Sequence, residues 1–197
     1  MLIKGLVDED FVNYKLPSMY IATATCSFKC DKECGKPVCQ NSELVKQPSI
    51  DIPNLDIAER YLENPITRAV VIGGLEPFDQ IDEMFDLICN IRTETIEKDK
   101  ILLSNGAWYH PWFAEREHPK AKDPIVIYTG YTREELDRMI YDNQDCDGAP
   151  TNLNEWCDGI GDIIIKFGRY IPNQKKHFDP VLGVYLASDN QYAERIS

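Results

Sequence analysis

Long apolar segments are missing from this 197-residue chain. A membrane-spanning helix needs about 20 consecutive apolar residues, and no run in the sequence approaches that length, so a helical membrane protein is excluded. The first residues, MLIKGLVDEDF, also lack the apolar stretch of a secretory signal peptide. We therefore expect a cytoplasmic protein with no membrane partner.

Basic residues are scarce as well. Lysine and arginine together number 21, against 33 aspartates and glutamates, so the formal net charge is −12. A broad nucleic-acid-binding face needs clustered positive charge, so nucleic acid is not an expected partner. The apolar fraction of 43% is that of an ordinary globular protein. A chain of this length can bury a sizeable core, and we expect a single domain over residues 1–197.

Cysteine, by contrast, is concentrated in one segment. Four of the seven cysteines lie within CSFKCDKECGKPVCQ, at Cys26, Cys30, Cys34 and Cys39. The odd total and the missing signal peptide favour reduced thiols over disulfides, so the segment predicts a metal or iron–sulfur site. Four thiolates suit a tetrahedral zinc ion, whereas three can hold a [4Fe–4S] cluster with one open iron. The spacing is not that of paired CxxC zinc motifs, but the cysteines alone leave both metals open.

The remaining cysteines point to no second site. Cys89 falls in an amphipathic segment, where a cysteine is usually a small buried apolar residue. Cys146 and Cys157 flank a polar loop and have no third partner nearby in the sequence. The sequence leaves the role of these two cysteines unassigned.

Continuous apolar runs predict buried strands. Ala69–Gly74 is typical of a strand covered on both faces, Pro124–Gly130 is another buried run, and Asp162–Ile171 is a further strand. Met19–Cys26 is an earlier strand, and the cysteine segment follows directly at its carboxyl end. Further strands are expected near Lys100–Gly106 and Val184–Ala187.

Amphipathic segments separate these runs. Helical spacing of apolar residues predicts helices over Ser49–Asn64 and Gln80–Arg92. A third helix should begin after Thr132, because Glu135 three residues later completes a capping box; residues 142–158 are polar and predict a loop. Alternating strands and helices predict an α/β fold with a mostly parallel sheet. Such folds bind their ligands at the carboxyl ends of the strands, which is where the cysteine segment lies.

Four further motifs follow one another along the chain. They are CQN at residues 39–41, GGLEP at 73–77, IVIYTGYTREEL at 125–136, and GRY at 168–170 with SDNQ at 188–191. In order and spacing they resemble the radical S-adenosylmethionine (SAM) enzymes, and among these the small activases of anaerobic ribonucleotide reductase. The resemblance covers nearly the whole chain. It implies a partial βα TIM-type barrel, with a [4Fe–4S] cluster held by three cysteines of the loop at residues 26–39.

The chain departs from that family at two places. Members usually show C-x3-C-x2-C, which is absent here. Either Cys26, Cys30 and Cys39 bind the cluster, or Cys34 replaces Cys39. We prefer Cys39, because an apolar residue precedes it and Gln-Asn follows it, as in the family. The second departure is Phe167, where many activases carry aspartate.

The resemblance also implies a set of SAM-binding residues. The glycine pair leaves the backbone unshielded for close approach of the cofactor, and Glu76 offers a carboxylate to its amino group. Thr129 and Gly130 would meet the ribose, and Asn190 would contact the adenosyl end. The full set carried over is Gly73, Gly74, Glu76, Thr129, Gly130 and Asn190.

The implied activity is reductive cleavage of SAM to a 5′-deoxyadenosyl radical. The short chain leaves little room for an auxiliary-cluster domain, which favours a protein substrate. The expected partners are a glycyl-radical enzyme resembling anaerobic ribonucleotide reductase and a low-potential electron donor such as flavodoxin or ferredoxin. Two alternatives are a small-molecule radical SAM enzyme, such as one of deazapurine synthesis, and a non-catalytic zinc or iron–sulfur binding module.

Overall fold

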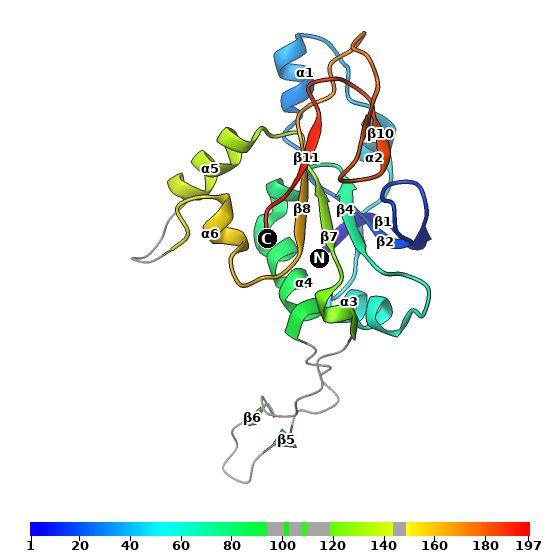
Figure 1. The fold of residues 1–197 in the computed structure, drawn as a ribbon, viewed down its shortest axis with the longest axis vertical. Coiled ribbons are helices and arrows are strands. Elements are labelled where there is room, and N and C mark those ends of the chain that lie inside the picture. The colour runs from blue at the N-terminus through cyan, green and yellow to red at the C-terminus, as the bar shows by residue number, and fades with distance from the viewer. Residues whose placement is uncertain (94–100, 103–107, 110–118, 144–148) are drawn as a thin grey trace.

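A seven-stranded sheet forms the centre of the computed structural model, which describes residues 1–93, 101–102, 108–109, 119–143 and 149–197 (Figure 1). The strand order is β11-β8-β7-β4-β2-β1-β3. The four central strands run parallel: β2 (Ser18–Thr23), β4 (Val70–Gly74), β7 (Ile125–Tyr128) and β8 (Ile163–Phe167). The outer strands are antiparallel to their neighbours: β1 (Leu2–Asp10), β3 (Ile50–Asp51) and β11 (Tyr192–Arg195). The predicted α/β class with a parallel central sheet is confirmed, and the described strands leave the sheet open at β11 and β3.

The helices pack together on one face of this sheet. They are α3 (Asn54–Glu63), α4 (Ile81–Thr93), α5 (Arg133–Asp142) and α6 (Leu153–Cys157). The parallel strands are adjacent in the order in which they occur in the sequence, and right-handed crossovers between such strands place these four helices on the same side. Alternate strand residues such as Val70 and Ile72 point into this layer, where they meet Ile57, Leu87 and other fully buried helix residues.

A second, smaller apolar cluster covers part of the opposite face. Val71, Val126 and Ile164 of the sheet pack there against Leu182 and Leu186. The covering segment includes a hairpin of β9 (His177–Asp179) and β10 (Val184–Leu186). Asp179 fixes this segment, because its carboxylate accepts hydrogen bonds from the amides of Val181, Leu182 and Ala193.

Several predicted elements are confirmed with shorter bounds. The helix predicted over Ser49–Asn64 is wrong in its first turn, because Ile50–Asp51 pairs with β1 as an edge strand. The strand predicted to end at Ile171 ends at Phe167, because Gly168 takes a φ of +94° that breaks the extended backbone. The capping box of Thr132 and Glu135 is present at the start of α5.

Other predictions were wrong or lie outside the described residues. Residues 142–158 are not all loop, since α6 begins after Asn152, whose side chain accepts a hydrogen bond from the amide of Glu155. Of the predicted strand Lys100–Gly106, only β5 (Ile101–Leu102) is described, and it pairs with β6 (Trp108–Tyr109) in a separate two-stranded sheet. Two short helices were not predicted: α1 (Lys29–Cys34) within the cysteine segment and α2 (Ser42–Lys46) just after it.

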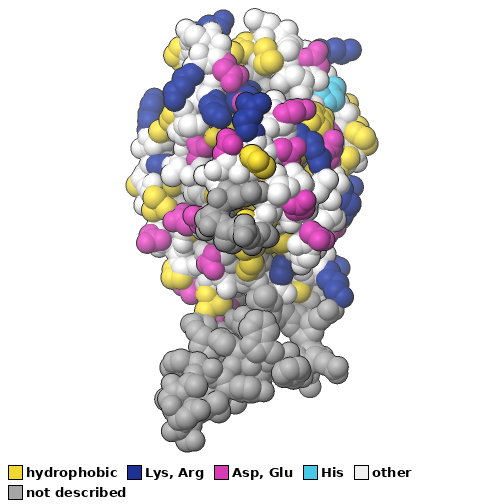
Figure 2. All heavy atoms as spheres, turned by 90° about the vertical axis from the view of Figure 1, so that its left-hand side faces the viewer, with side chains coloured by type: hydrophobic (Ala, Val, Ile, Leu, Met, Phe, Trp, Pro, Cys, Tyr) yellow, Lys and Arg dark blue, Asp and Glu magenta, His cyan; other side chains and the backbone are white. Residues whose placement is uncertain are grey.

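The surface carries charges of both signs. On the face of the molecule that presents α5 and α6, acidic and basic side chains are interspersed (Figure 2). None of the helices in the described part of the chain is both long enough and apolar enough to cross a membrane.

Candidate functional site

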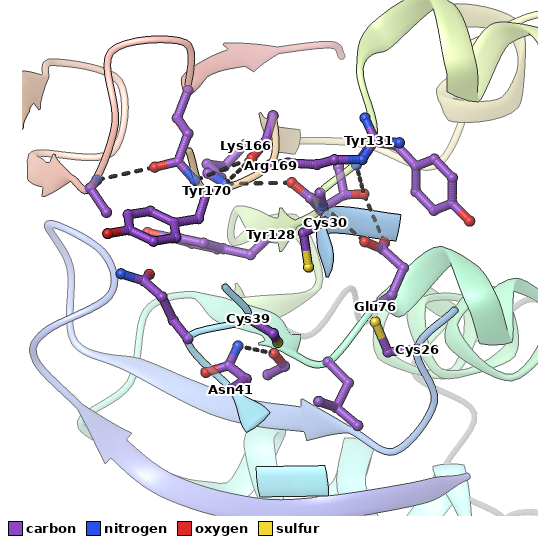
Figure 3. Close-up of a pocket in the computed structure, with 18 of the residues that line it drawn as sticks. Cys26, Cys30, Cys39, Asn41, Glu76, Tyr128, Tyr131, Lys166, Arg169 and Tyr170 are labelled. Carbon is purple, nitrogen blue, oxygen red and sulfur yellow. Dashed lines mark hydrogen bonds between the residues drawn. The ribbon is translucent and has the colours of Figure 1, made fainter. Parts of the chain in front are cut away.

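A cavity of about 340 Å³ lies at the carboxyl ends of the four parallel strands (Figure 3). Each strand end contributes to it, because parallel strands bring their carboxyl ends to one edge of the sheet. The carboxyl ends of the strands supply most of the lining. It consists of Cys26, Ser27, Lys29 and Cys30 after β2, residues 74–76 at the end of β4, 128–131 at the end of β7, Lys166 and 168–170 at the end of β8, the second part of the cysteine loop at 39–41, residues 185–187, and Asn13, Tyr20 and Gln191.

Three of the four loop cysteines line this cavity. They are Cys26, Cys30 and Cys39, whereas Cys34 is described but is not among the lining residues. Burial raises the pKa of both Cys26 and Cys30 to about 11, and the neighbouring Cys39 thiol acts in the same direction. The three thiols are therefore close enough to influence one another, and those of Cys26 and Cys30 are protonated at neutral pH.

The fold of the loop explains how Cys39 reaches Cys30. Helix α1 ends after Cys34 at Gly35, which adopts a φ of +64° and reverses the chain. The carboxylate Oδ1 of Asp31 then accepts hydrogen bonds from the amides of Val38 and Cys39, each 2.8 Å long. One side chain at the start of the loop thus holds its end and brings Cys39 back to the cavity.

The cysteine loop is also tied to the glycine turn. The side-chain amide of Asn41 donates a hydrogen bond to the carbonyl of Gly74 (Figure 3). Gly74 has a φ of +83°, and a Cβ there would lie 2.8 Å from both Cα and Cβ of Ala22, so only glycine fits. Gly73 does not line the cavity; a Cβ on it would lie 3.3 Å from Cβ of Tyr128.

Glu76, Thr129 and Gly130 form one hydrogen-bonded unit in the cavity wall. The buried carboxylate of Glu76 accepts from Thr129 Oγ1 at 2.7 Å and from the Gly130 amide at 2.8 Å. It also accepts from the amide of Phe78 at 3.3 Å. Burial raises the pKa of Glu76 to about 7, although these hydrogen bonds oppose the shift. A carboxylate offers about four acceptor sites, so one remains for a ligand. The predicted contacts to SAM stay predictions.

Asn190 takes a different position from the other predicted residues. It is exposed, lies outside the cavity lining, and donates through Nδ2 to the carbonyl of Arg169 at 2.9 Å. Its neighbour Gln191 is buried and lines the cavity. Gln191 accepts from the amides of Ala187 and Ser188 and donates to the carbonyl of Gly168. The predicted contact of Asn190 with the adenosyl end stays a prediction.

Charged side chains that were not predicted also line the cavity. Arg169 pairs with Glu135 at 2.7 Å and with Glu33 of α1 at 3.3 Å. The ammonium of Lys29 lies 4.1 Å from the ring centre of Tyr131. A third cation is Lys166 of β8. Its signal in the sequence is a single lysine within the apolar run IIIKF, and Arg169 belongs to the GRY motif without having been assigned a role.

Phe167, the second departure from the family pattern, points away from the cavity. It is fully buried in the helix-covered cluster, with its ring centre 5.3 Å from that of Tyr192. Strand alternation explains this, because Lys166 and Gly168 on either side of it line the cavity. Phe167 therefore contributes to the core.

The donor set fits an iron–sulfur cluster. Among the described residues, no three His, Cys, Asp or Glu side chains converge on a point where they would hold one metal ion. In a cluster each cysteine binds a different iron, so the three thiols need to share a cavity without meeting at one point, and Cys26, Cys30 and Cys39 line the same cavity. Cys157 is buried in the core of the fold, where burial raises its pKa to about 12. Cys146 lies outside the described residues.

Comparisons of this chain with known proteins identified no related protein. Scans of the chain against protein-family models, curated proteins and solved structures found no match. The function is therefore argued from the motifs of the chain and from the geometry of the cavity that they line.

Proposed function

We propose that this chain is a radical SAM enzyme that carries one [4Fe–4S] cluster and acts as a glycyl-radical activase. One observation carries the proposal. Three cysteines of the loop line the same cavity as the GGLEP turn and the YTGY strand end, and the fourth does not. Motifs that lie between residues 26 and 131 of the sequence thus meet at one edge of the sheet, where α/β folds bind their ligands.

The fold supports a partial βα barrel as the finer description. The parallel strands follow their order in the sequence, and the helices that pack on them share one face, as in the wall of a barrel. The opposite face would then be the barrel interior. The cavity opens on this face, beside the inward-pointing Tyr128 and Lys166.

Cys26, Cys30 and Cys39 would hold the cluster at the cavity. When bound, a reduced cluster of this type supplies the electron that cleaves a C–S bond of SAM and yields the 5′-deoxyadenosyl radical. The thiols must first lose their protons, because the pKa values of Cys26 and Cys30 are about 11 in their buried positions.

The protein's own part is to bind and orient SAM and to exclude water. Gly74 lets the turn pack closely against Ala22, and Asn41 occupies its carbonyl, which fixes the turn beside the cavity. Thr129 and Gly130 fix the carboxylate of Glu76, which keeps an acceptor site for the amino group of SAM. Tyrosine rings give the cavity apolar walls that displace solvent; they belong to Tyr20, Tyr128, Tyr131, Tyr170 and Tyr185.

The partner assignment rests on the resemblance to activases and on chain length. We propose a cytoplasmic enzyme whose substrate is a glycyl-radical protein resembling anaerobic ribonucleotide reductase. Its electrons would come from flavodoxin or ferredoxin. Electron paramagnetic resonance of a candidate partner, incubated anaerobically with this enzyme and SAM, should then show a glycyl radical.

Reconstitution decides the chemistry and the third ligand together. The chain is loaded anaerobically with iron and sulfide, reduced in the presence of SAM, and assayed for 5′-deoxyadenosine. We expect release from the wild type and a loss of at least about 100-fold in Cys39→Ala, because loss of even an indirect partner of a metal ligand costs up to this much. Cys34→Ala is the matched control and should keep the iron content and the release of the wild type.

Each other outcome contradicts a defined part of the proposal. Absence of 5′-deoxyadenosine from the loaded wild type would contradict radical SAM chemistry. Loss in Cys34→Ala with retention in Cys39→Ala would overturn the choice of third ligand. Release of 5′-deoxyadenosine without any glycyl radical on partner proteins would remove the activase assignment and favour a small-molecule substrate.

A further inference from the structure

Lys166 occupies an unusual place for a lysine. In β8, Ile163, Ile165 and Phe167 point into the helix-covered core, so Lys166 points to the opposite face. It pairs in register with Tyr128 of β7 and lines the cavity (Figure 3). Only 6% of its surface is exposed.

The ammonium group of Lys166 binds the ends of two strands. Its Nζ donates to the carbonyl of Gly168 at 2.7 Å and lies 3.5 Å from the carbonyl of Thr129. The Gly168 carbonyl also accepts from Gln191 Nε2 at 3.2 Å, so the turn at residues 188–191 joins the same point. One cation thus connects β7, β8 and the carboxyl-terminal turn behind the cavity wall.

The charge at this position comes at an energetic cost. An ammonium removed from water is destabilising unless it is paired, and burial lowers the pKa of Lys166 to about 8, with the carboxylate of Glu76 acting in the opposite direction. An apolar side chain of similar length would fill the space without that cost. The hydrogen bonds to two strand ends are what such a side chain could not supply.

Lys166 and Glu76 both contact Thr129, at its backbone carbonyl and its hydroxyl respectively. Glu76 binds the hydroxyl of Thr129 and the amide of Gly130, while Lys166 binds the carbonyl of Thr129. We infer that Lys166 is a positioning residue, whose ammonium clamps the ends of β7 and β8 so that Thr129 and Gly130 hold Glu76 in its orientation toward SAM. The clamp is a property of the chain itself, and only its consequence for SAM rests on the proposed function.

Hydrogen–deuterium exchange of the full chain without cofactor tests the clamp directly. In Lys166→Met, amides of residues 129–131 and 168–170 should exchange about tenfold faster than in the wild type, the effect of losing one charge-assisted hydrogen bond. Lys120→Met is the matched control. Lys120 is also buried and also donates to a backbone carbonyl, that of Tyr61, but it lies outside the cavity lining. Its loss should leave those two segments unchanged.

The affinity for SAM tests the consequence. After reconstitution, Lys166→Met should keep its iron content and bind SAM about tenfold more weakly, as expected for an orienting hydrogen bond. Lys166→Arg keeps the charge and the donors and should recover part of the affinity. Lys120→Met should bind SAM as the wild type does.

The outcomes separate the clamp from the proposed function. Unchanged exchange at both segments in Lys166→Met, or an equal increase over the whole chain, would overturn the clamp. Faster exchange with unchanged SAM affinity would overturn the positioning role. If the wild type binds no SAM, the proposed function fails while the exchange data still decide the clamp. Should Lys166→Met fail to fold, Lys166→Gln, which keeps one donor but no charge, takes its place in the exchange measurement.

Discussion

Two buried lysines lie in contrasting surroundings, one at each end of the parallel strands. Near the amino end, Lys120 donates to the carbonyl of Tyr61 at 2.8 Å and to Thr67 Oγ1 at 3.0 Å. The hydroxyl of Tyr61 in turn donates to the carboxylate of Asp123, which lies two residues before the first residue of β7. At the carboxyl end, Lys166 borders a cavity instead. A buried lysine therefore joins loops at the amino ends of the strands and borders a cavity at their carboxyl ends.

Arg92 holds together the loops at the amino ends of the parallel strands. Its guanidinium donates to the carbonyls of Ala121 and Asp123 before β7, and to those of Ile160 and Asp162 before β8. The four carbonyls belong to two loops that enter neighbouring strands. Here cations gather backbone carbonyls and hold loops together. At the carboxyl end, by contrast, the buried carboxylate of Glu76 has three hydrogen bonds, keeps one acceptor site and borders a cavity. The contrast teaches that a buried charge indicates a binding site only where it borders a cavity.

Among the substitutions considered, replacement of Arg92 should lower the free energy of unfolding most. Arg92→Met leaves four carbonyls short of a donor, and we expect a loss of about 4 kcal/mol in the free energy of unfolding. Urea unfolding of the chain without cofactor measures it. Iron binding by the folded fraction should stay at the wild-type level; a specific loss of iron would show that the two ends are coupled.

Gly74→Ala tests the carboxyl end. The substitution places an alanine at a φ of +83° and adds a Cβ that would lie only 2.8 Å from Ala22. It should therefore lower the free energy of unfolding by about 3 kcal/mol. Gly35→Ala is the control, since its φ of +64° is also left-handed but a Cβ there meets nothing within 4 Å, so about 1 kcal/mol is expected. Equal losses in urea unfolding would mean that close packing at Gly74 does not matter.

Glu76→Gln should change how stability depends on pH. The pKa of Glu76 is raised from 4.5 to about 7 by burial, so the folded chain holds this proton more tightly than the unfolded chain. The stabilisation is complete below pH 4.5 and is lost as pH rises toward 7, with a slope of at most about 1.4 kcal/mol per pH unit. The variant lacks this dependence and should gain relative to the wild type as pH rises through that window.

Urea midpoints of wild type and Glu76→Gln, measured at several pH values across the window, check the slope. A constant difference between the two proteins would contradict the prediction. It would indicate that a nearby cation, of which Lys166 is the candidate inside the cavity, fully neutralises the carboxylate in the folded state.

Long patterns in the sequence predicted the fold well. The run AVVIGG is buried on both faces as β4, and the apolar spacing of residues 81–91 appears as the buried side of α4. Short elements were beyond such reasoning. Helices α1, α2 and α6 have six, five and five residues, less than two turns each, so no apolar period can develop.

The site was predictable where a motif carries its own geometry. GGLEP and YTGY were placed at strand ends by sequence, and both lie at the cavity. The choice between Cys34 and Cys39 depends instead on Asp31, whose carboxylate binds amides seven and eight residues further along. Lys166 was missed because a strand run that looks buried on both faces hides the one position that faces a cavity.

The hydrogen bonds of Asp31 have a consequence for loading of the site. Closing a loop costs conformational entropy, and the folded chain has already met this cost before any iron arrives, because Cys39 is held at the cavity by Asp31. What remains is chemical: Cys26 and Cys30, each with a pKa of about 11, must give up their protons to bind metal. On the proposed assignment, acidity more than chain order would govern how readily this loop takes up a cluster.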